Sequence, residues 1–315
     1  MSHPMIELRG LHRTFGQTRA VNDISFEVPK GTVLGYVGPN GAGKTTSMRI
    51  LATLDVPSLG DAYVDGFSVI DDPDRVRRRL GFMPDSYGTY ADVNCWEYLD
   101  FFARAYGLMG AERSRAIREV MGFTRLEGLR DKPIRGLSKG MKQRLCLGRA
   151  ILHDPGVLIM DEPAAGLDPR ARIELREMIR ELSNNGKTVL ISSHILTELA
   201  EMCDQVAIIE LGRLIAIGTV EQIMRERSPH RAVRVRVLGG VEPLLNWLAP
   251  RCERKEVFDL KTEGEVVRFC HELSPEQEAQ MLRQMILDGV VVSEFGGHVT
   301  SLEEVFMSVT QGEVQ

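Results

Sequence analysis

Eight residues between a predicted strand and a predicted helix have the types and spacing that bind a polyphosphate. Apolar residues at 32–37 have the composition of a buried strand, and residues 44–54 continue at helical spacing. Between them lies a match to G-x-x-x-x-G-K-[ST], made of Gly38, Pro39, Asn40, Gly41, Ala42, Gly43, Lys44 and Thr45. Glycines allow a tight turn that points several backbone N–H groups at one place, the N-terminus of the helix. The loop therefore predicts a site for a nucleoside triphosphate.

Three side chains of this loop have distinct expected roles. Lys44 is expected to reach the β- and γ-phosphates, Thr45 to hold Mg²⁺, and Thr46 to add a phosphate contact. An ordinary glycine turn is the alternative. The full match in a strand-loop-helix context argues against that alternative.

A pair of carboxylates follows a second apolar strand. Residues 157–160 read Val-Leu-Ile-Met, and Asp161 and Glu162 come directly after them. In this arrangement the first acid orders Mg²⁺ and the second polarises a water molecule. Asp161 is therefore the predicted metal ligand, and Glu162 is the predicted general base.

A loop of this kind occurs in many unrelated proteins, so it does not identify the protein class by itself. Three further segments reduce the number of possible classes. Residues 137–144 open a predicted helix that runs to about Leu152, and Ser138 with Gly140 at its start predicts a second anion site. Asp168 closes the segment Ala-Gly-Leu-Asp shortly after the acid pair. His194 follows an apolar strand with a hydroxyl-rich end.

In this order the segments resemble the ATP-binding cassette of the ABC ATPases over roughly residues 4–226. The resemblance is specific because residues 137–141, Leu-Ser-Lys-Gly-Met, are similar to the family's signature sequence. It implies an α/β P-loop fold in residues 1–226, with a mixed sheet and a helical insert at about 86–152. It also implies that two copies enclose two ATP molecules, with Ser138 and Gly140 of one copy touching the γ-phosphate held by the other.

The same resemblance implies roles for three more residues. His194 would contact the γ-phosphate, Asp168 would link the two sites, and Phe15 would stack on adenine. Each has a plainer alternative. Asp168, which precedes a proline, is a good helix N-cap. A histidine after a strand is often only hydrogen-bonded within the fold or exposed to solvent. Phe15, which precedes a glycine, can simply anchor a turn.

One position departs from the family pattern. Where the family usually has glutamine after Gly-aromatic-x-Pro, this chain has Asp85, following residues 81–84. Aspartate offers a charged oxygen on a shorter side chain, and we expect it to help hold Mg²⁺. A solvated loop acid is the alternative.

Composition limits the possible classes of function. The 315 residues are 43% hydrophobic and 26% charged, enough for about two domains with cores. A net charge of −5 argues against a nucleic-acid partner, and the short arginine run at 75–79 is expected to be a solvated helix face. Five scattered cysteines without a C-x-x-C pair fit a reducing compartment.

Nothing in the sequence reads as a membrane span or a signal peptide. We therefore expect a cytoplasmic chain, peripheral on the inner face of the membrane through an integral membrane permease. By resemblance the permease would dock on the helical insert, where residues 96–106 and 113–121 predict two helices. The aromatic residues of the first helix are mostly expected in its core, with one or two exposed for docking.

The segment 227–315 has no catalytic constellation. Its predicted order of elements, β-α-β-β-α-β, is the ferredoxin-like pattern. A final helix is predicted by the capping box of Ser301 and Glu304. This tail resembles those of ATPases from drug, lipid and polysaccharide exporters, and we expect a role in dimer contact, regulation or stability.

The sequence thus predicts an ATPase subunit of an ABC exporter, with ATP and Mg²⁺ as cofactors and a homodimer or a sister cassette as its working form. A regulatory ATP sensor, in which binding rather than turnover carries the signal, is one alternative, and Glu162 and His194 argue against it. A non-transport ABC ATPase acting on DNA or ribosomes is the other alternative. Such proteins usually carry two cassettes, coiled-coil heptads or paired cysteines, which this chain lacks.

Overall fold

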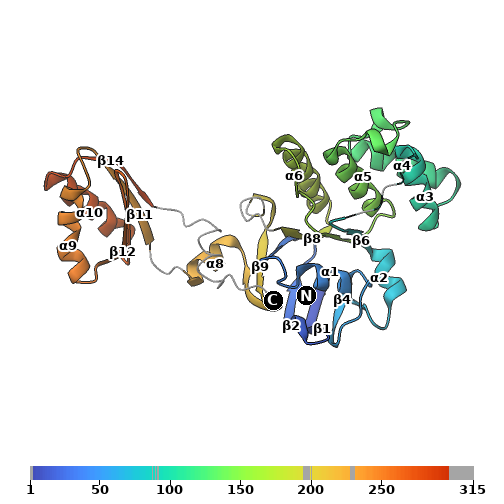
Figure 1. Ribbon diagram of the computed structural model, residues 1–315, viewed down its shortest axis with the longest axis horizontal. Helices are drawn as coiled ribbons and strands as arrows, with labels where there is room; N and C mark the ends of the chain where they lie inside the picture. Colours follow the sequence, from blue (N-terminus) through green and yellow to red (C-terminus); the bar gives the residue numbers. More distant parts are fainter. Residues whose placement is uncertain are drawn as a thin grey trace. The chain divides into compact units, whose positions relative to one another are not determined.

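The computed structural model describes residues 3–86, 88, 90, 92–193, 199, 201–227 and 231–297, without the side chains of 224–227. The chain separates into two compact units that divide between Val220 and Glu221 (Figure 1). Each unit is described by itself. The first contains the glycine-rich loop and the carboxylate pair, and α8 (Val220–Arg227) begins at the boundary.

The first unit contains two sheets and a layer of helices. Its strands are β1 (Ile6–Phe15), β2 (Thr18–Val28), β3 (Val33–Val37), β4 (Leu59–Val64), β5 (Phe67–Ser68), β6 (Leu80–Met83), β7 (Val157–Met160), β8 (Thr188–Ser193), β9 (Gln205–Glu210) and β10 (Arg213–Gly218). Its main helices are α1 (Lys44–Leu51), α2 (Pro73–Arg79), α3 (Cys95–Ala105), α4 (Gly110–Phe123), α5 (Lys139–Ile151) and α6 (Pro169–Asn184).

The central sheet has the strand order β10-β9-β3-β8-β7-β6, and only β10 pairs antiparallel. Strands β3, β7 and β8 are buried at every position, as their unbroken apolar character requires for parallel strands covered on both faces. Parallel strands bring their carboxyl ends to one edge of the sheet. The loop after β3, the acids after β7 and the end of β8 therefore meet there.

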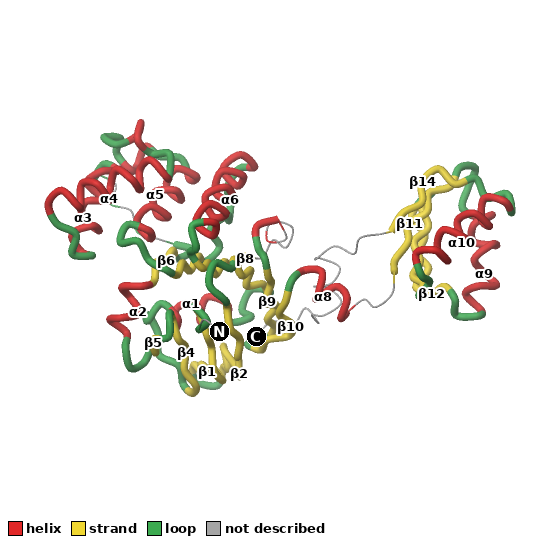
Figure 2. The backbone as a smooth tube through the Cα atoms, turned by 180° about the vertical axis from the view of Figure 1, so that it is seen from behind, coloured by secondary structure: helices red, strands yellow, loops and turns green. Residues whose placement is uncertain are grey.

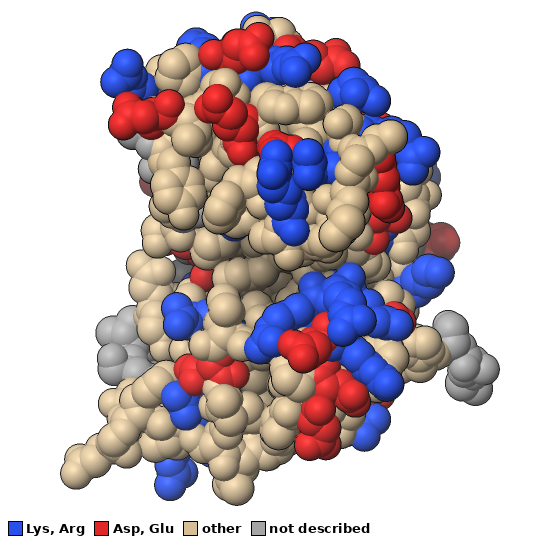
Figure 3. Space-filling model, turned by 90° about the vertical axis from the view of Figure 1, so that its right-hand side faces the viewer, with Lys and Arg blue, Asp and Glu red and all other residues tan. Residues whose placement is uncertain are grey.

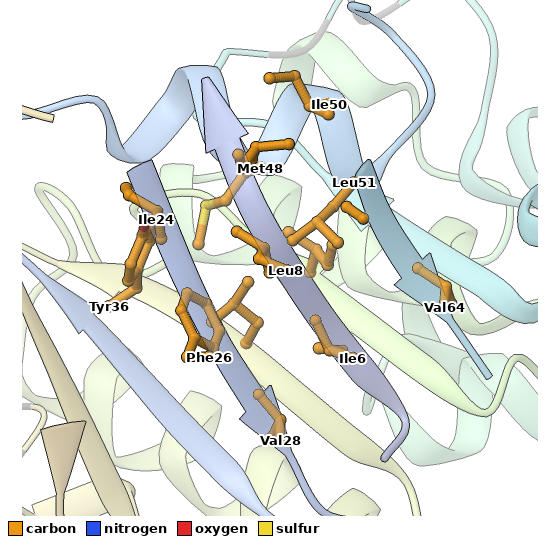
Figure 4. Packing of buried hydrophobic residues seen from close by; sticks show 14 of the residues in the cluster. Ile6, Leu8, Ile24, Phe26, Val28, Tyr36, Met48, Ile50, Leu51 and Val64 are labelled. Atoms are coloured by element: carbon orange, nitrogen blue, oxygen red, sulfur yellow. The ribbon is translucent and has the colours of Figure 1, made fainter. Parts of the chain in front are cut away.

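The second sheet is antiparallel, in the order β2-β1-β4-β5. Apolar side chains from this sheet pack against α1 and the central sheet, as the labelled residues of Figure 4 show. Helix α1 ends at Leu51, three residues before the expected Leu54. Thr53 adopts a left-handed conformation with φ of 58°, which stops the helix. The core thus fixes one end of α1, and the glycine-rich loop precedes the other.

Helices α3, α4 and α5 form a layer with its own hydrophobic core (Figure 2). Asn94 caps α3, and Glu97 completes a capping box. The second helix of this insert begins at Gly110, three residues before the expected Arg113. Among the helices that the structure describes, none is long and apolar enough to cross a membrane.

The second unit contains a four-stranded antiparallel sheet and, among its described residues, two helices besides α8. Its elements are β11 (Arg231–Val237), α9 (Glu242–Glu253), β12 (Val257–Glu263), β13 (Val266–His271), α10 (Pro275–Leu287) and β14 (Val292–Gly297). The strand order β12-β13-β11-β14 is that of a ferredoxin-like module, and the element order is the one expected from the sequence.

Two boundaries in this unit differ from the sequence-based expectation. The last strand was expected at 290–292 but begins at Val292, because the Val290 amide donates to the Met285 carbonyl of α10 and its side chain packs into the core. Helix α9 was expected to end near Leu248 but continues to Glu253. The capping box of Ser301 and Glu304 lies outside the described residues.

Candidate nucleotide-binding and hydrolysis site

The glycine-rich loop turns between β3 and α1 as the pattern requires. Gly41 and Gly43 have φ angles of 84° and 99°, in the left-handed region that favours glycine. A Cβ atom at Gly43 would lie 2.2 Å from the carbonyl oxygen of Ala20. The backbone therefore passes β2 too closely for any side chain at this position.

Lys44 is held against its own loop. Its Nζ donates to the carbonyl oxygens of Gly38 and Pro39 over 2.6 and 3.2 Å. Burial lowers the pKa of Lys44, while the nearby carboxylates of Glu162 and Asp161 act in the opposite direction. The carbonyl oxygens of the loop thus hold the ammonium group of Lys44 close to the loop backbone.

A cavity of about 430 Å³ opens in front of this loop. It brings together residues from four parts of the sequence, and its lining is Phe15, Thr18, Ala20, Asn40, Gly41, Gly43, Lys44, Thr45, Thr46, Asp85 and Glu162. Phe15, the expected base-stacking residue, lies at the end of β1 with 48% of its surface exposed. Asp85, after β6, is exposed in the same cavity.

A serine of the neighbouring strand contacts the side chain of Asp161 and the backbone of Glu162 at the end of β7. Ser192 donates its hydroxyl proton to Asp161 Oδ1 over 2.6 Å, and the Glu162 amide donates to Ser192 Oγ over 2.8 Å. Asp161 is 1% exposed, and its own amide donates to the Met83 carbonyl on β6. One hydroxyl group therefore fixes both acids at the edge of the sheet.

Glu162 has a strained backbone. Its φ angle is 50°, and non-glycine residues adopt this region at a cost of about 1–2 kcal/mol. Such strain persists where the surroundings hold it, often at functional sites. Here the Ser192 hydroxyl accepts a hydrogen bond from the Glu162 amide, and Glu162 is among the residues that line the cavity.

The donor set fits a magnesium ion held together with phosphates. Mg²⁺ is usually bound by one or two carboxylates, with the remaining ligands from water and substrate phosphates. Asp161 supplies a nearly fully buried carboxylate, and Thr45 and Asp85 line the adjoining cavity. Among the described residues, no group of three or more His, Cys, Asp or Glu side chains could hold a metal ion without such help.

Ser138 and Gly140 do not line this cavity. Ser138 caps α5, and its Oγ accepts a hydrogen bond from the Met141 amide. Gly140 lies against α6, where an added Cβ atom would be 3.0 Å from Ala171 Cβ. The two predicted anion sites of one chain are therefore separate.

Asp168 has the structural role that its sequence context allows. It caps α6, with Oδ1 accepting from the Ala171 amide over 2.9 Å. Asp168 is also exposed, so the capping bond does not prevent a contact with a second copy of the chain. His194, the remaining predicted site residue, lies outside the described residues.

Two positioning residues were not assigned from the sequence. Ser192 was seen only as part of a hydroxyl-rich strand end, and the pairing of β7 with β8 reveals its contacts. Gln143 on α5 donates through Nε2 to the Pro163 carbonyl over 2.7 Å, which ties the signature helix to the loop after Glu162. Gln143 is 4% exposed, and a buried polar side chain is normally hydrogen-bonded. Its position on the buried face of a predicted helix was therefore the feature of the sequence that could have indicated this contact.

The helical insert carries exposed aromatic side chains. Tyr98 is buried, whereas Phe101 on α3 is 55% exposed and Tyr90 is 59% exposed. The two exposed rings pack edge to face with centroids 6.1 Å apart. Figure 3 shows the face over α2 and α3, where a hollow runs between two lobes and basic side chains gather beside it.

Comparison with protein families and curated proteins gives consistent matches. The family model described as ABC transporter matches residues 21–165. The Nod factor export ATP-binding protein I of Ralstonia nicotianae is 34% identical over 316 residues, covering 100% of this chain and 96% of that protein. The protein of the same name from Rhizobium sp. (strain N33) is 34% identical, with 100% of both chains covered.

Solved structures match most of the chain. A structure described as the ATP-binding subunit of an ABC transporter has a TM-score of 0.65 and 33% identity, and the match covers 70% of this chain and 92% of that one. The structure of cbiO1 from Clostridium perfringens, part of the ABC transporter complex cbiONQ, has a TM-score of 0.65 and 25% identity, with coverage of 80% and 98%.

Proposed function

The chain belongs to the ATP-binding subunits of ABC transporters and is an exporter-type ATPase, and on this basis we propose the role of each part and of each site residue. We propose that residues 1–226 are the ATPase domain and 227–315 an accessory domain. Within the ATPase domain, the loop from Gly38 to Thr46 binds the triphosphate of ATP. The cavity that joins this loop to Glu162 and Phe15 supports the proposal.

Binding of the triphosphate depends on positive charge and backbone N–H groups at the start of α1. Lys44 moves from the carbonyl oxygens of its own loop to the phosphates. Thr45, Asp161 and Asp85 would hold Mg²⁺, which when bound neutralises charge on the phosphate oxygens. Phe15 offers its exposed ring as a stacking surface for adenine.

Hydrolysis requires a water molecule oriented toward the γ-phosphate. Glu162 is the proposed general base, because it lines the cavity and its backbone amide is hydrogen-bonded to Ser192. His194 is the proposed second contact to the γ-phosphate. Lys44 stabilises negative charge that develops on the transferred phosphoryl group.

A second copy of the chain, or a sister cassette, completes the site. Ser138 and Gly140 are separate from the cavity of their own chain, which supports their action on the nucleotide of a partner. Backbone N–H groups at the start of α5 suit an anion. Asp168 is the proposed link between the two sites.

The exposed aromatic residues of the helical insert support docking of a membrane permease. Closure of two cassettes on Mg-ATP would move the permease through this surface, and hydrolysis would release it. Because the curated relatives are named for Nod factor export, we propose a cargo of that kind, within the lipid and polysaccharide class. Through the permease, the chain would lie on the inner face of the membrane.

The single observation that carries the proposed hydrolysis is the bridge from Ser192 to both acids at the cavity edge. The transport role is tested by capture of the Glu162→Gln protein from detergent-solubilised membranes of its native host in Mg-ATP. A stoichiometric multi-span membrane protein identified by mass spectrometry is the expected result. A Lys44→Ala variant is the control for nucleotide-dependent capture. Recovery of only ribosomal or DNA-associated proteins would contradict the role.

A further inference from the structure

Arg13 lies behind the proposed adenine-stacking residue. Its guanidinium carbon is 4.4 Å from the centroid of the Phe15 ring and lies over that ring. The two residues are two positions apart near the end of β1, where the pairing with β2 shifts register between Arg13 and Thr14. Phe15 lines the nucleotide cavity, whereas Arg13 is not part of the lining. One face of the ring is thus covered by a cation, and the ring borders the cavity.

Arg13 is itself held in place. Its guanidinium group makes a two-point contact with Asp55, with an NH2 to Oδ1 distance of 2.7 Å and an Nε to Oδ2 distance of 3.3 Å. The side chains are 25% and 17% exposed, so the contact is partly shielded from water. Asp55 is fixed in turn by the Val56 amide, which donates to its Oδ1 over 2.8 Å. Because two nitrogen atoms of Arg13 contact the two carboxylate oxygens of Asp55, the orientation of the planar guanidinium group is fixed.

The loop that contains Asp55 braces the end of β1 at two more points. The Thr14 amide donates to Ser58 Oγ over 3.1 Å, and the Ser58 amide donates to the His12 carbonyl over 2.7 Å. This loop follows α1, whose first residue is Lys44. The helix that presents its N-terminus to the phosphates therefore leads, at its other end, into the loop that holds Arg13.

We propose that Arg13 is a positioning residue for the nucleobase, which holds the Phe15 ring in the orientation that stacks on adenine. The inference rests on the proposed role of Phe15. A cation over an aromatic ring is attracted by the ring's quadrupole, and this attraction restricts the ring to one orientation before the base arrives. Preorganisation of this kind strengthens binding because less freedom is lost when the ligand binds.

The test compares ligands with and without a base. Dissociation constants for ATP and for tripolyphosphate are measured by isothermal titration calorimetry on the full chain in EDTA, where no turnover occurs. Arg13→Met is expected to weaken ATP binding by ~2- to 5-fold, the range of an exposed cation–π contact. Tripolyphosphate binding is expected to stay unchanged, since it has no base. Arg13→Lys keeps the charge but loses the fork, and an intermediate loss is expected.

The chain offers a matched control on the same strand. Arg9 lies over the Tyr63 ring, also with 4.4 Å to the centroid, and forms a two-point contact with Glu7 away from the cavity. Arg9→Met should leave ATP binding unchanged. An equal loss of ATP affinity in Arg9→Met and Arg13→Met would show a general effect on β1 and overturn the inference.

A double-mutant cycle separates this inference from the proposed role of Phe15. If Arg13 acts through Phe15, Arg13→Met should cause no further loss in a Phe15→Ala background. Unchanged ATP binding in Phe15→Ala would refute Phe15 as the stacking residue. A loss in Phe15→Ala without a loss in Arg13→Met would refute only the role of Arg13. Equal losses for ATP and tripolyphosphate in Arg13→Met would do the same.

Discussion

Ser192 donates its hydroxyl proton to Asp161 Oδ1 over 2.6 Å, at a position where both side chains are buried. The Oγ atom of Ser192 also accepts a hydrogen bond from the Glu162 amide. The proposed metal ligand and the proposed base, although adjacent in sequence, are thus oriented by a third residue on the next strand. One hydroxyl group therefore contacts the carboxylate of Asp161 and the backbone of Glu162.

Removal of this hydroxyl should reduce turnover. Ser192→Ala leaves Asp161 Oδ1 and the Glu162 amide without this partner, at a cost of about 1–3 kcal/mol, and kcat should fall by ~5- to 100-fold. Ser192→Thr should restore much of the activity because it keeps the hydroxyl. Steady-state ATPase assays check both, with Ser183→Ala as a control because that hydroxyl bonds to the Gly31 carbonyl. Full activity in Ser192→Ala would refute the positioning role.

Loss of the proposed base should separate binding from hydrolysis. Glu162→Gln keeps the shape of the side chain but removes the proton acceptor, so turnover should fall by ~10²- to 10⁴-fold while ATP still binds. Single-turnover hydrolysis and calorimetric ATP titration measure the two effects. Glu177→Gln on α6, paired with Arg125, is the control. Near-normal turnover in Glu162→Gln would assign the base elsewhere.

Two glycines of the loop should differ in their tolerance of alanine. Both need left-handed backbone, but a Cβ atom at Gly43 would collide with the Ala20 carbonyl, whereas at Gly41 no heavy atom lies within 4 Å. Gly43→Ala should therefore lower the free energy of unfolding more than Gly41→Ala, which should lose about 1–2 kcal/mol from backbone strain alone. Urea unfolding without nucleotide checks the order. Equal losses would show that the loop moves away from β2 easily.

Asp85 should influence metal dependence. Asp85→Gln replaces a carboxylate with the neutral oxygen donor usual at this place in the family, and turnover should remain within a few-fold. Asp85→Ala removes the donor, so half-maximal activity should need more Mg²⁺. A Mg²⁺ titration of ATPase activity measures this, with Asp92→Ala as a control on an exposed acid. An unchanged titration curve in Asp85→Ala would mean that Asp85 is only a solvated loop acid.

His271 should make the second unit sensitive to acid. It is fully buried on β13, its Nδ1 accepts from the Leu273 amide, and it faces Glu278 of α10 and Arg231 of β11. Burial lowers the pKa of His271 below its ordinary 6.5, although Glu278 raises it. The unfolded chain therefore binds the proton more readily. Stability is complete above about pH 6.5 and falls below it, by at most ~1.4 kcal/mol per pH unit.

The measurement uses one of the two tryptophans as a local probe. In a Trp96→Phe background, fluorescence of Trp247 on α9 reports urea unfolding of the second unit. The midpoint should fall between pH 7.5 and pH 5.5, and His271→Asn should flatten this dependence. His12→Asn, in the first unit, serves as the control. The same slope in His271→Asn as in the parent protein would contradict the assignment.

Local sequence patterns were enough to predict several elements. The helix at 275–287 is observed at its predicted ends because proline follows a serine cap at its start. The helix at Ser138 was likewise predicted from its cap. The predicted ends of helices and strands were less accurate where contacts with distant residues decide them. The strand expected at Val290 begins at Val292, and α1 stops before Leu54, because packing and a left-handed residue decide these ends.

The sequence by itself determined the ligand class and the family, because the loop from Gly38 to Thr45 and the acids after β7 depend on residue types at short spacing. Only the tertiary structure decided that Ser192 bridges the two acids and that Arg13 covers the Phe15 ring. Those contacts join strands and loops that are distant in the chain, and the pairing of β7 with β8 and the fold of the loop after α1 create them. A local sequence pattern cannot predict contacts between residues that are so far apart in the chain.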